Sequence, residues 1–271
     1  MGRLLPDFKP LPTKPVCQCD PQCQRAPMPN MPWCGYHKPS SRGNNTRKAS
    51  SCQFSPTSGF EPIFNPNAWS KNKFLKESHN CFAYAIDTVD PKLILDCKKT
   101  PECDVGFPQP GYNSGHKKFA DQKEKGCADM VSRLWGDNPR VKTTEFSIQC
   151  PNRTSKIALI VDPKRDYHFL RQDPDGYWSH KPGALQVKRE DSTGRPIIRP
   201  DRAMFIYKDK TDPIIYTHFC GYFCVPRGEP LHMSKESSWN KFIETYERPV
   251  SPGSKNTRYN KTRRRRREEV K

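Results

Sequence analysis

The chain has 271 residues, and 47 lysines and arginines against 29 aspartates and glutamates give it a net charge of +18. Only 33% of its residues are hydrophobic and 28 are prolines, so much of the chain cannot enter one buried core. The longest aliphatic run, Ile157 to Val161, is far shorter than the roughly 20 residues that a membrane helix needs. The first residues match neither a secretory nor a myristoylation signal. We therefore expect a domain with extended arms, without a membrane span, made and kept in the cytoplasm.

The positive charge is concentrated at the two ends of the chain. Residues 1–60 carry a net +6 and residues 251–271 a net +7, which leaves +5 for the 190 residues between them. The first arm is rich in proline and then in Ser, Asn and Arg, a composition that favours extended, solvated chain. The last arm contains Arg263 to Arg267, which suit nucleic acid, a nuclear-import receptor or an acidic protein surface; a solvated, disordered tail is the simplest alternative.

Cysteines near the N-terminus have the spacing of a metal site. Tetrahedral zinc needs four ligands from two short segments, and Cys17 with Cys23 and Cys34 with His37 supply them. Cys19 is then a spare, or it replaces Cys17. The segment 17–37 has few aliphatic residues, so the metal would have to provide its folding energy. Disulfides among the four cysteines, or unmodified thiols, are the alternatives.

The remaining cysteines carry less information. Without an export signal, twelve cysteines favour metal ligation or catalysis over a disulfide framework. The pairs Cys97/Cys103 and Cys220/Cys224 are spaced poorly for zinc, so we expect buried thiols there. The spacing of Cys52, Cys127 and Cys150 predicts nothing.

A domain begins near Phe60, where aromatic residues become frequent. Asn80 is placed to cap a helix whose apolar positions run from Phe82 to Val89 and which Pro91 ends. Cys81 then lies in the first turn, where the helix dipole and the unpaired amides favour the nucleophilic thiolate and could also receive an oxyanion.

A predicted hairpin brings two histidines together. Strand-like runs at 156–162 and 166–172 precede the turn 173–176 and a third run at 177–181. A three-residue loop closed by Gly176 pairs Leu170 with His180, which places His180 diagonal to His168 on the same face. This arrangement suggests Cys81 as nucleophile, His168 as its base and His180 as the orienting group. A satisfied core histidine in an ordinary hairpin is the alternative.

At these residues the sequence resembles a known family. NCFAYA at 80–85, FPQPGYNSG at 107–115, DYHFLRQDPDGYWSHKPG at 166–183 and FCGYFCV at 219–225 resemble papain-like hydrolases related to the NlpC-type peptidases, with members in bacteria and large DNA viruses. In those enzymes a cysteine opens a helix, a histidine lies on a following strand and a third polar residue follows about a dozen positions later. Cys81, His168 and His180 match that order. Asn80 stands where the family usually has Asp, and Phe82-Ala83 replaces a Ser-Gly pair. The longer gap before His168 implies an insertion, 98–149, that covers or reshapes the cleft. Near the N-terminus, PWCGYHK resembles small zinc knuckles.

Together these features predict an α+β protein with three parts. Residues 1–59 form a proline-rich arm with the zinc knuckle, 60–250 a papain-like domain, and 251–271 a basic tail. The resemblance implies hydrolysis of an amide, isopeptide or thioester bond in a peptide-like substrate through Asn80, Cys81, His168 and His180, in host cytoplasm or in a virion. The alternative is a minor capsid protein that uses an inactive domain as scaffold and its arms to contact capsid proteins. Nucleic-acid binding through knuckle and tail is a third possibility.

Overall fold

The structure is a computed structural model that describes residues 4–20, 22–23, 25–34, 52–117, 126–208, 213–228 and 231–233. Its framework is an antiparallel sheet in the order β1-β8-β3-β4-β5, with β2 also paired to β8. The strands are β1 (Lys9–Pro10), β2 (Lys142–Thr144), β3 (Thr154–Asp162), β4 (Asp166–Gln172), β5 (Trp178–His180) and β8 (His218–Pro226). A separate short pair joins β6 (Ile206–Tyr207) to β7 (Ile214–Ile215).

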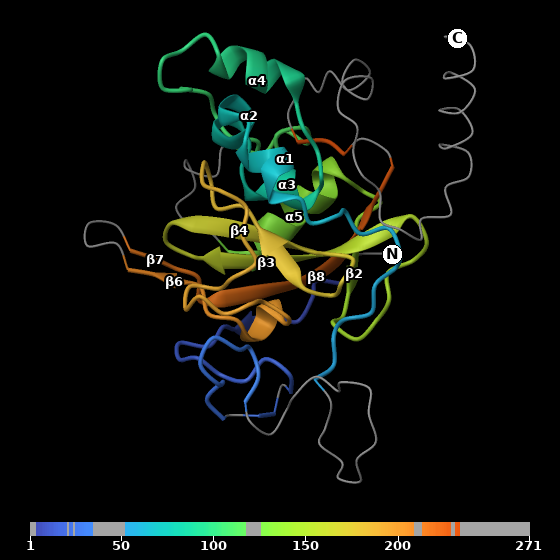
Figure 1. The fold of residues 1–271 in the computed structure, drawn as a ribbon. Coiled ribbons are helices and arrows are strands. Elements are labelled where there is room, and N and C mark those ends of the chain that lie inside the picture. Colours follow the sequence, from blue (N-terminus) through green and yellow to red (C-terminus); the bar gives the residue numbers. More distant parts are fainter. Residues whose placement is uncertain are drawn as a thin grey trace, which may run out of the picture.

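Helices cover one face of the sheet (Figure 1). They are α1 (Pro66–Ser70), α2 (Lys73–Ser78), α3 (Cys81–Ala85), α4 (Pro91–Cys97) and α5 (Cys127–Asp137). Their apolar side chains meet alternate residues of the strands, such as Leu159 and Phe169. The coarse α+β prediction is therefore confirmed. Among the described residues, no helix has the length and apolar character needed to span a bilayer.

The opposite face of the sheet has its own core. Ile160, Leu170 and Trp178 point to this side, where they pack with Phe205 and Tyr222. The N-terminal segment and the segment after β5 cover this face (Figure 1). A sheet with two covered faces explains why β3 and β4 are buried along almost their whole length.

The predicted hairpin has the expected register. Leu170 pairs with His180, and Gly176 adopts a φ of 88° while its N–H donates to the Asp173 carbonyl. The Asp173 N–H donates to the carbonyl of Tyr177 at 2.8 Å, which closes the three-residue loop. Turn chemistry alone was sufficient to fix which side chains share a face here.

The predicted helix is shorter than its apolar pattern suggested. Asn80 caps it as expected, but α3 ends at Ala85, and Asp87 takes a φ of 54°. Pro91 begins a helix instead of ending one, because Asp90 caps α4 and proline suits the first helical turn.

The N-terminal segment is packed on the domain where the sequence predicted an extended arm. β1 pairs with Phe219 and His218 of β8, and the Gln18 side chain accepts hydrogen bonds from the N–H groups of Ile198 and Arg199. The Cys19–Cys52 disulfide links two parts of the N-terminal segment to each other. His37 and the tail 251–271 lie outside the described residues, as does the predicted domain end at 250.

Four disulfides replace the buried thiols that spacing favoured. Besides Cys19–Cys52 they are Cys97–Cys103, Cys127–Cys220 and Cys150–Cys224. Two of them attach to β8, where a bulge opposite Leu159/Ile160 directs Cys220 toward the helices. The prediction of buried thiols for Cys97, Cys103, Cys220 and Cys224 was wrong. The partners of Cys220 and Cys224 lie 93 and 74 residues away and leave no local pattern, whereas Cys97 and Cys103, 6 residues apart, bond to each other although their spacing was weighed only against zinc.

Candidate functional site

The Asn80 side chain caps the start of α3. Its side-chain oxygen accepts hydrogen bonds from the N–H groups of Phe82 and Ala83, at 3.2 and 3.3 Å. Its amide nitrogen donates to the Pro108 carbonyl, so part of the segment 98–149 lies against this end of the helix. Two amides of the first turn, those of Phe82 and Ala83, are therefore already occupied by the cap.

The Cys81 thiol is buried and protonated. The residue is 4% exposed, and its Sγ lies 3.9 Å from the Tyr167 carbonyl oxygen. Burial, with a smaller contribution from Asp166, raises the pKa of Cys81 to about 12. This is opposite to the lowered pKa that a helix start predicted, because a five-residue helix offers little field to offset the loss of water.

His168 and His180 form the predicted pair. The His168 Nε2 lies 2.7 Å from the His180 Nδ1, and the His180 Nε2 lies 2.9 Å from the Glu190 carbonyl oxygen. That carbonyl can only accept, so His180 carries its proton on Nε2, and its Nδ1 accepts a hydrogen bond from the His168 Nε2–H. Burial lowers the pKa of His180 to about 4 and that of His168 well below its usual range. Both rings are therefore neutral near pH 7.

The structure does not join the thiol to these rings. Cys81 belongs to the core between helices and sheet, while His168 packs on Tyr216 in the opposite core, with ring centres 5.6 Å apart. No hydrogen bond links Cys81 to either imidazole in the part of the chain that is described. Of the four predicted catalytic residues, the two histidines are together, and Asn80 serves Cys81 only as a helix cap.

A buried lysine next to this region was not predicted. The Lys181 Nζ donates to the carbonyls of Lys76, His79 and Gly183, and burial lowers its pKa to about 7. Three carbonyl acceptors match the three N–H donors of an ammonium group. Lys181 therefore ties the end of α2 to the chain after β5, and its position directly after His180 was the only sequence signal.

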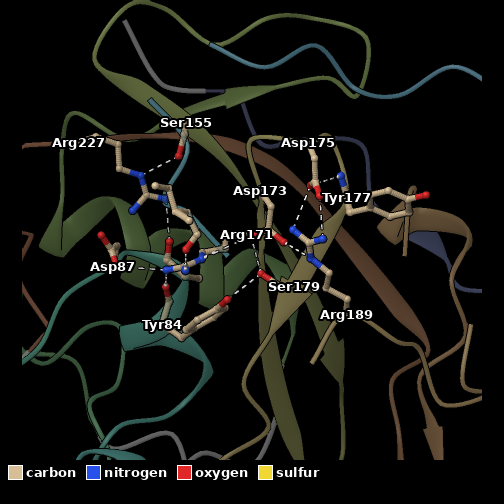
Figure 2. A network of polar contacts seen from close by, with 12 residues as sticks. Tyr84, Asp87, Ser155, Arg171, Asp173, Asp175, Tyr177, Ser179, Arg189 and Arg227 are labelled. Carbon is tan, nitrogen blue, oxygen red and sulfur yellow. Dashed lines mark hydrogen bonds and ion pairs between the residues drawn. The ribbon is translucent and has the colours of Figure 1, made fainter. Parts of the chain in front are cut away.

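A polar network joins α3 to the hairpin (Figure 2). The Tyr84 hydroxyl lies 2.8 Å from the Ser179 Oγ, which donates to Asp173 at 2.7 Å. Arg189 donates to Asp173 and, with both terminal nitrogens, to Asp175. Burial raises the pKa of Asp173 to about 6, although Arg171 and Arg189 oppose the shift. The sequence identified Asp173 only as a turn residue.

Three of the four predicted metal ligands come together. The Sγ atoms of Cys17, Cys23 and Cys34 all lie within 4.8 Å of one another, and those of Cys23 and Cys34 are 3.7 Å apart. All three residues are buried and outside the disulfides. They could hold a metal ion. Cys19, the predicted spare or substitute, is excluded because it is bonded to Cys52.

The three-cysteine cluster is fixed to the domain through its backbone. The Arg202 guanidinium donates to the carbonyls of Cys17 and Cys23. Gln18 lies between the ligands and accepts from the N–H groups of Ile198 and Arg199. The cluster is thus held in place by side chains that do not themselves bind a metal.

These observations define a disulfide-stabilised α+β protein with a buried, protonated thiol and a compact cysteine cluster. The chain is 30% identical over 141 residues to insoluble matrix shell protein 1 of Ruditapes philippinarum, and the match covers 52% of this chain and 79% of that protein. The chain belongs to the family of that shell protein. No family model and no solved structure matches the chain, so the papain-like resemblance stays a prediction.

Proposed function

We propose that this protein is a structural component of an insoluble extracellular matrix, stabilised by its disulfides and without hydrolase activity. The observation that carries the proposal is the four disulfides, which use eight of the twelve cysteines. Such frameworks persist in oxidising compartments and are rare in the cytosol. The family relation to an insoluble matrix shell protein supports the same setting.

The state of Cys81 supports a structural role over an enzymatic one. Thiol hydrolases need a thiolate near neutral pH. Here burial favours the neutral thiol, and burial also lowers the pKa of His168, so the imidazole expected to take the thiol proton is a weak base. The domain then contributes a rigid scaffold, and the five consecutive arginines Arg263 to Arg267 supply charge suited to acidic partners.

A thiol hydrolase, in a virion or elsewhere, is the second candidate. The observation in its favour is the 2.7 Å contact between His168 and His180 at the spacing that the resemblance implies. Capsid partners and nucleic-acid binding by the tail remain predictions of that alternative.

Fractionation of the source tissue tests the structural proposal. Antibodies should find the full chain in the extracellular, detergent-insoluble fraction, and mass mapping without reduction should recover the four disulfide-linked peptide pairs. Detection only inside cells with these cysteines reduced would contradict the proposal. Cys81-dependent hydrolysis of a peptide or thioester panel would favour the enzyme instead.

We also propose that the cysteine cluster holds zinc, with His37 as the fourth ligand. Three converging thiols and one imidazole form a common structural zinc set. Purified protein should contain about one zinc per chain, and replacing Cys34 and His37 together should remove it. Cys81→Ser is the matched control, because Cys81 is an equally buried thiol outside the cluster. An unchanged zinc content in the double variant would overturn the assignment.

A further inference from the structure

The three-cysteine cluster is reduced within a molecule whose other cysteines, Cys81 excepted, are all oxidised. The contrast is sharp because Cys19 lies between two cluster residues in sequence and is itself disulfide-bonded to Cys52. Whatever oxidant forms Cys19–Cys52 also reaches this segment. Some feature of the cluster must therefore keep its thiols from oxidation.

Distance does not protect them. The Sγ atoms of Cys23 and Cys34 are 3.7 Å apart, so small side-chain rotations would bring them to the roughly 2.05 Å of a disulfide bond. Cys17 forms a disulfide with Cys34 less readily, because the Cys17 Sγ already accepts a hydrogen bond from the Cys34 N–H at 3.3 Å. Cys23 and Cys34 are the pair set to oxidise.

We propose that a bound metal ion protects this pair, so that the cluster is a redox-sensitive clasp: metal-loaded and reduced, or metal-free with a Cys23–Cys34 disulfide. A metal-bound thiolate offers its lone pair to the ion and is a weaker attacking group in disulfide exchange. This inference rests on the metal proposal above, and it adds that oxidation and metal loss regulate the site.

The reaction balances with a small-molecule disulfide as oxidant. The Cys23 and Cys34 thiolates, once the ion has left, lose two electrons and form one S–S bond. A glutathione disulfide accepts those electrons, its S–S bond breaks, and two glutathione thiols leave after taking up two protons. Cys17 remains a single thiol.

Oxidation would also change how the N-terminal segment is held. In the reduced cluster the Arg202 guanidinium reaches the carbonyls of both Cys17 and Cys23. A Cys23–Cys34 bond brings two of the three sulfur atoms closer together and leaves Cys17 without a covalent link to either. The site that fixes residues 17–34 to the domain thus has two chemical states with different internal links.

Alkylation of the full-length protein tests the proposal. One sample keeps its zinc and a second is treated with a chelator; both receive glutathione disulfide, and samples are quenched with N-ethylmaleimide for intact mass and peptide mapping. We expect the chelated protein to lose two alkylatable thiols at least about tenfold faster, with Cys23 linked to Cys34. Cys34→Ser should abolish that linked peptide, and Cys81→Ser should not.

Zinc content, measured in the same samples, separates this inference from the assignment on which it rests. Bound zinc with equal oxidation rates in the two samples would overturn the protective role alone. Protein that binds no zinc would overturn the zinc assignment. A linked pair other than Cys23–Cys34 in the chelated protein would refute the proposed clasp. Should Cys34→Ser fail to fold, the two wild-type samples still decide the matter.

Discussion

The Cys81 thiol shows how burial outweighs position in a helix. Burial raises its pKa to about 12, so at pH 7 only a minute fraction is thiolate. Iodoacetamide should therefore label Cys81 of the native protein more than about a thousandfold more slowly than in denaturant, where the thiol returns to its usual pKa. Peptide mapping after timed labelling gives both rates. Preferential labelling of Cys81 near pH 6 would restore the hydrolase interpretation.

Gly221 is required by a close contact as well as by its backbone. Its φ is 124°, and an added Cβ would meet the Pro6 side chain at 2.9 Å. Gly221→Ala should lower the free energy of unfolding by about 1–3 kcal/mol, as measured by urea titration. The control is Gly228→Ala, which also has positive φ, at 81°, but no atom within 4 Å. If the two variants lose equal stability, the contact with Pro6 contributes nothing.

At the scale of elements, the disulfides differ in the length of chain they close. Cys127–Cys220 joins α5 to β8 across 93 residues, whereas Cys97–Cys103 spans only 6. In the chain-entropy account these loops contribute about 4–5 and about 2 kcal/mol. Replacing both cysteines of the long loop with Ala should thus lower the denaturation midpoint more than the same change in the short loop. The reverse order would show that local strain, not loop length, dominates.

The hairpin and the helix show what the sequence could and could not predict. Pro174 and Gly176 specify their turn locally, so the His168/His180 geometry followed from residues a few positions apart. The end of α3 depends on Arg171, which donates to the Tyr84 carbonyl and to Asp87 from a strand 84 residues further along. Disulfide partners and the burial of Cys81 depend on equally distant contacts. Local spacing recovered the cysteine cluster because its ligands lie within one short segment.

For the whole molecule, buried histidines predict a loss of stability in acid. Burial is the largest cause of a lowered pKa in three buried histidines. It lowers the pKa of His79 to about 3 and that of His180 to about 4, and it also lowers the pKa of His168. Between pH 6.5 and these values the unfolded chain binds protons that the folded chain does not, so stability falls as pH falls. Asp173, whose pKa is raised to about 6, acts in the opposite direction from about pH 6 down to its unfolded value of 3.8, but it is one group against three.

We expect the free energy of unfolding at pH 4 to be lower than at pH 7, with His180 alone contributing about 3 kcal/mol. Urea titrations at the two pH values measure the difference. His180→Gln should reduce it, whereas His218→Gln, at an exposed position, should not. Equal stability at both pH values would mean that the histidines are hydrated or charged in the folded protein.

The Cys19–Cys52 disulfide also decides how the chain responds to a mechanical load. Tension applied along the backbone passes from Cys19 to Cys52 through sulfur, so the residues between them are not stretched. The 33-residue separation corresponds to about 110 Å of extended chain held in reserve. Cys127–Cys220 and Cys150–Cys224 shield overlapping stretches in the same way, and both end on β8. Under oxidising conditions the stretches between bonded cysteines should therefore stay unextended in a pulled molecule, while the rest of the chain extends. Added reductant should release these lengths as separate steps in a single-molecule pulling trace.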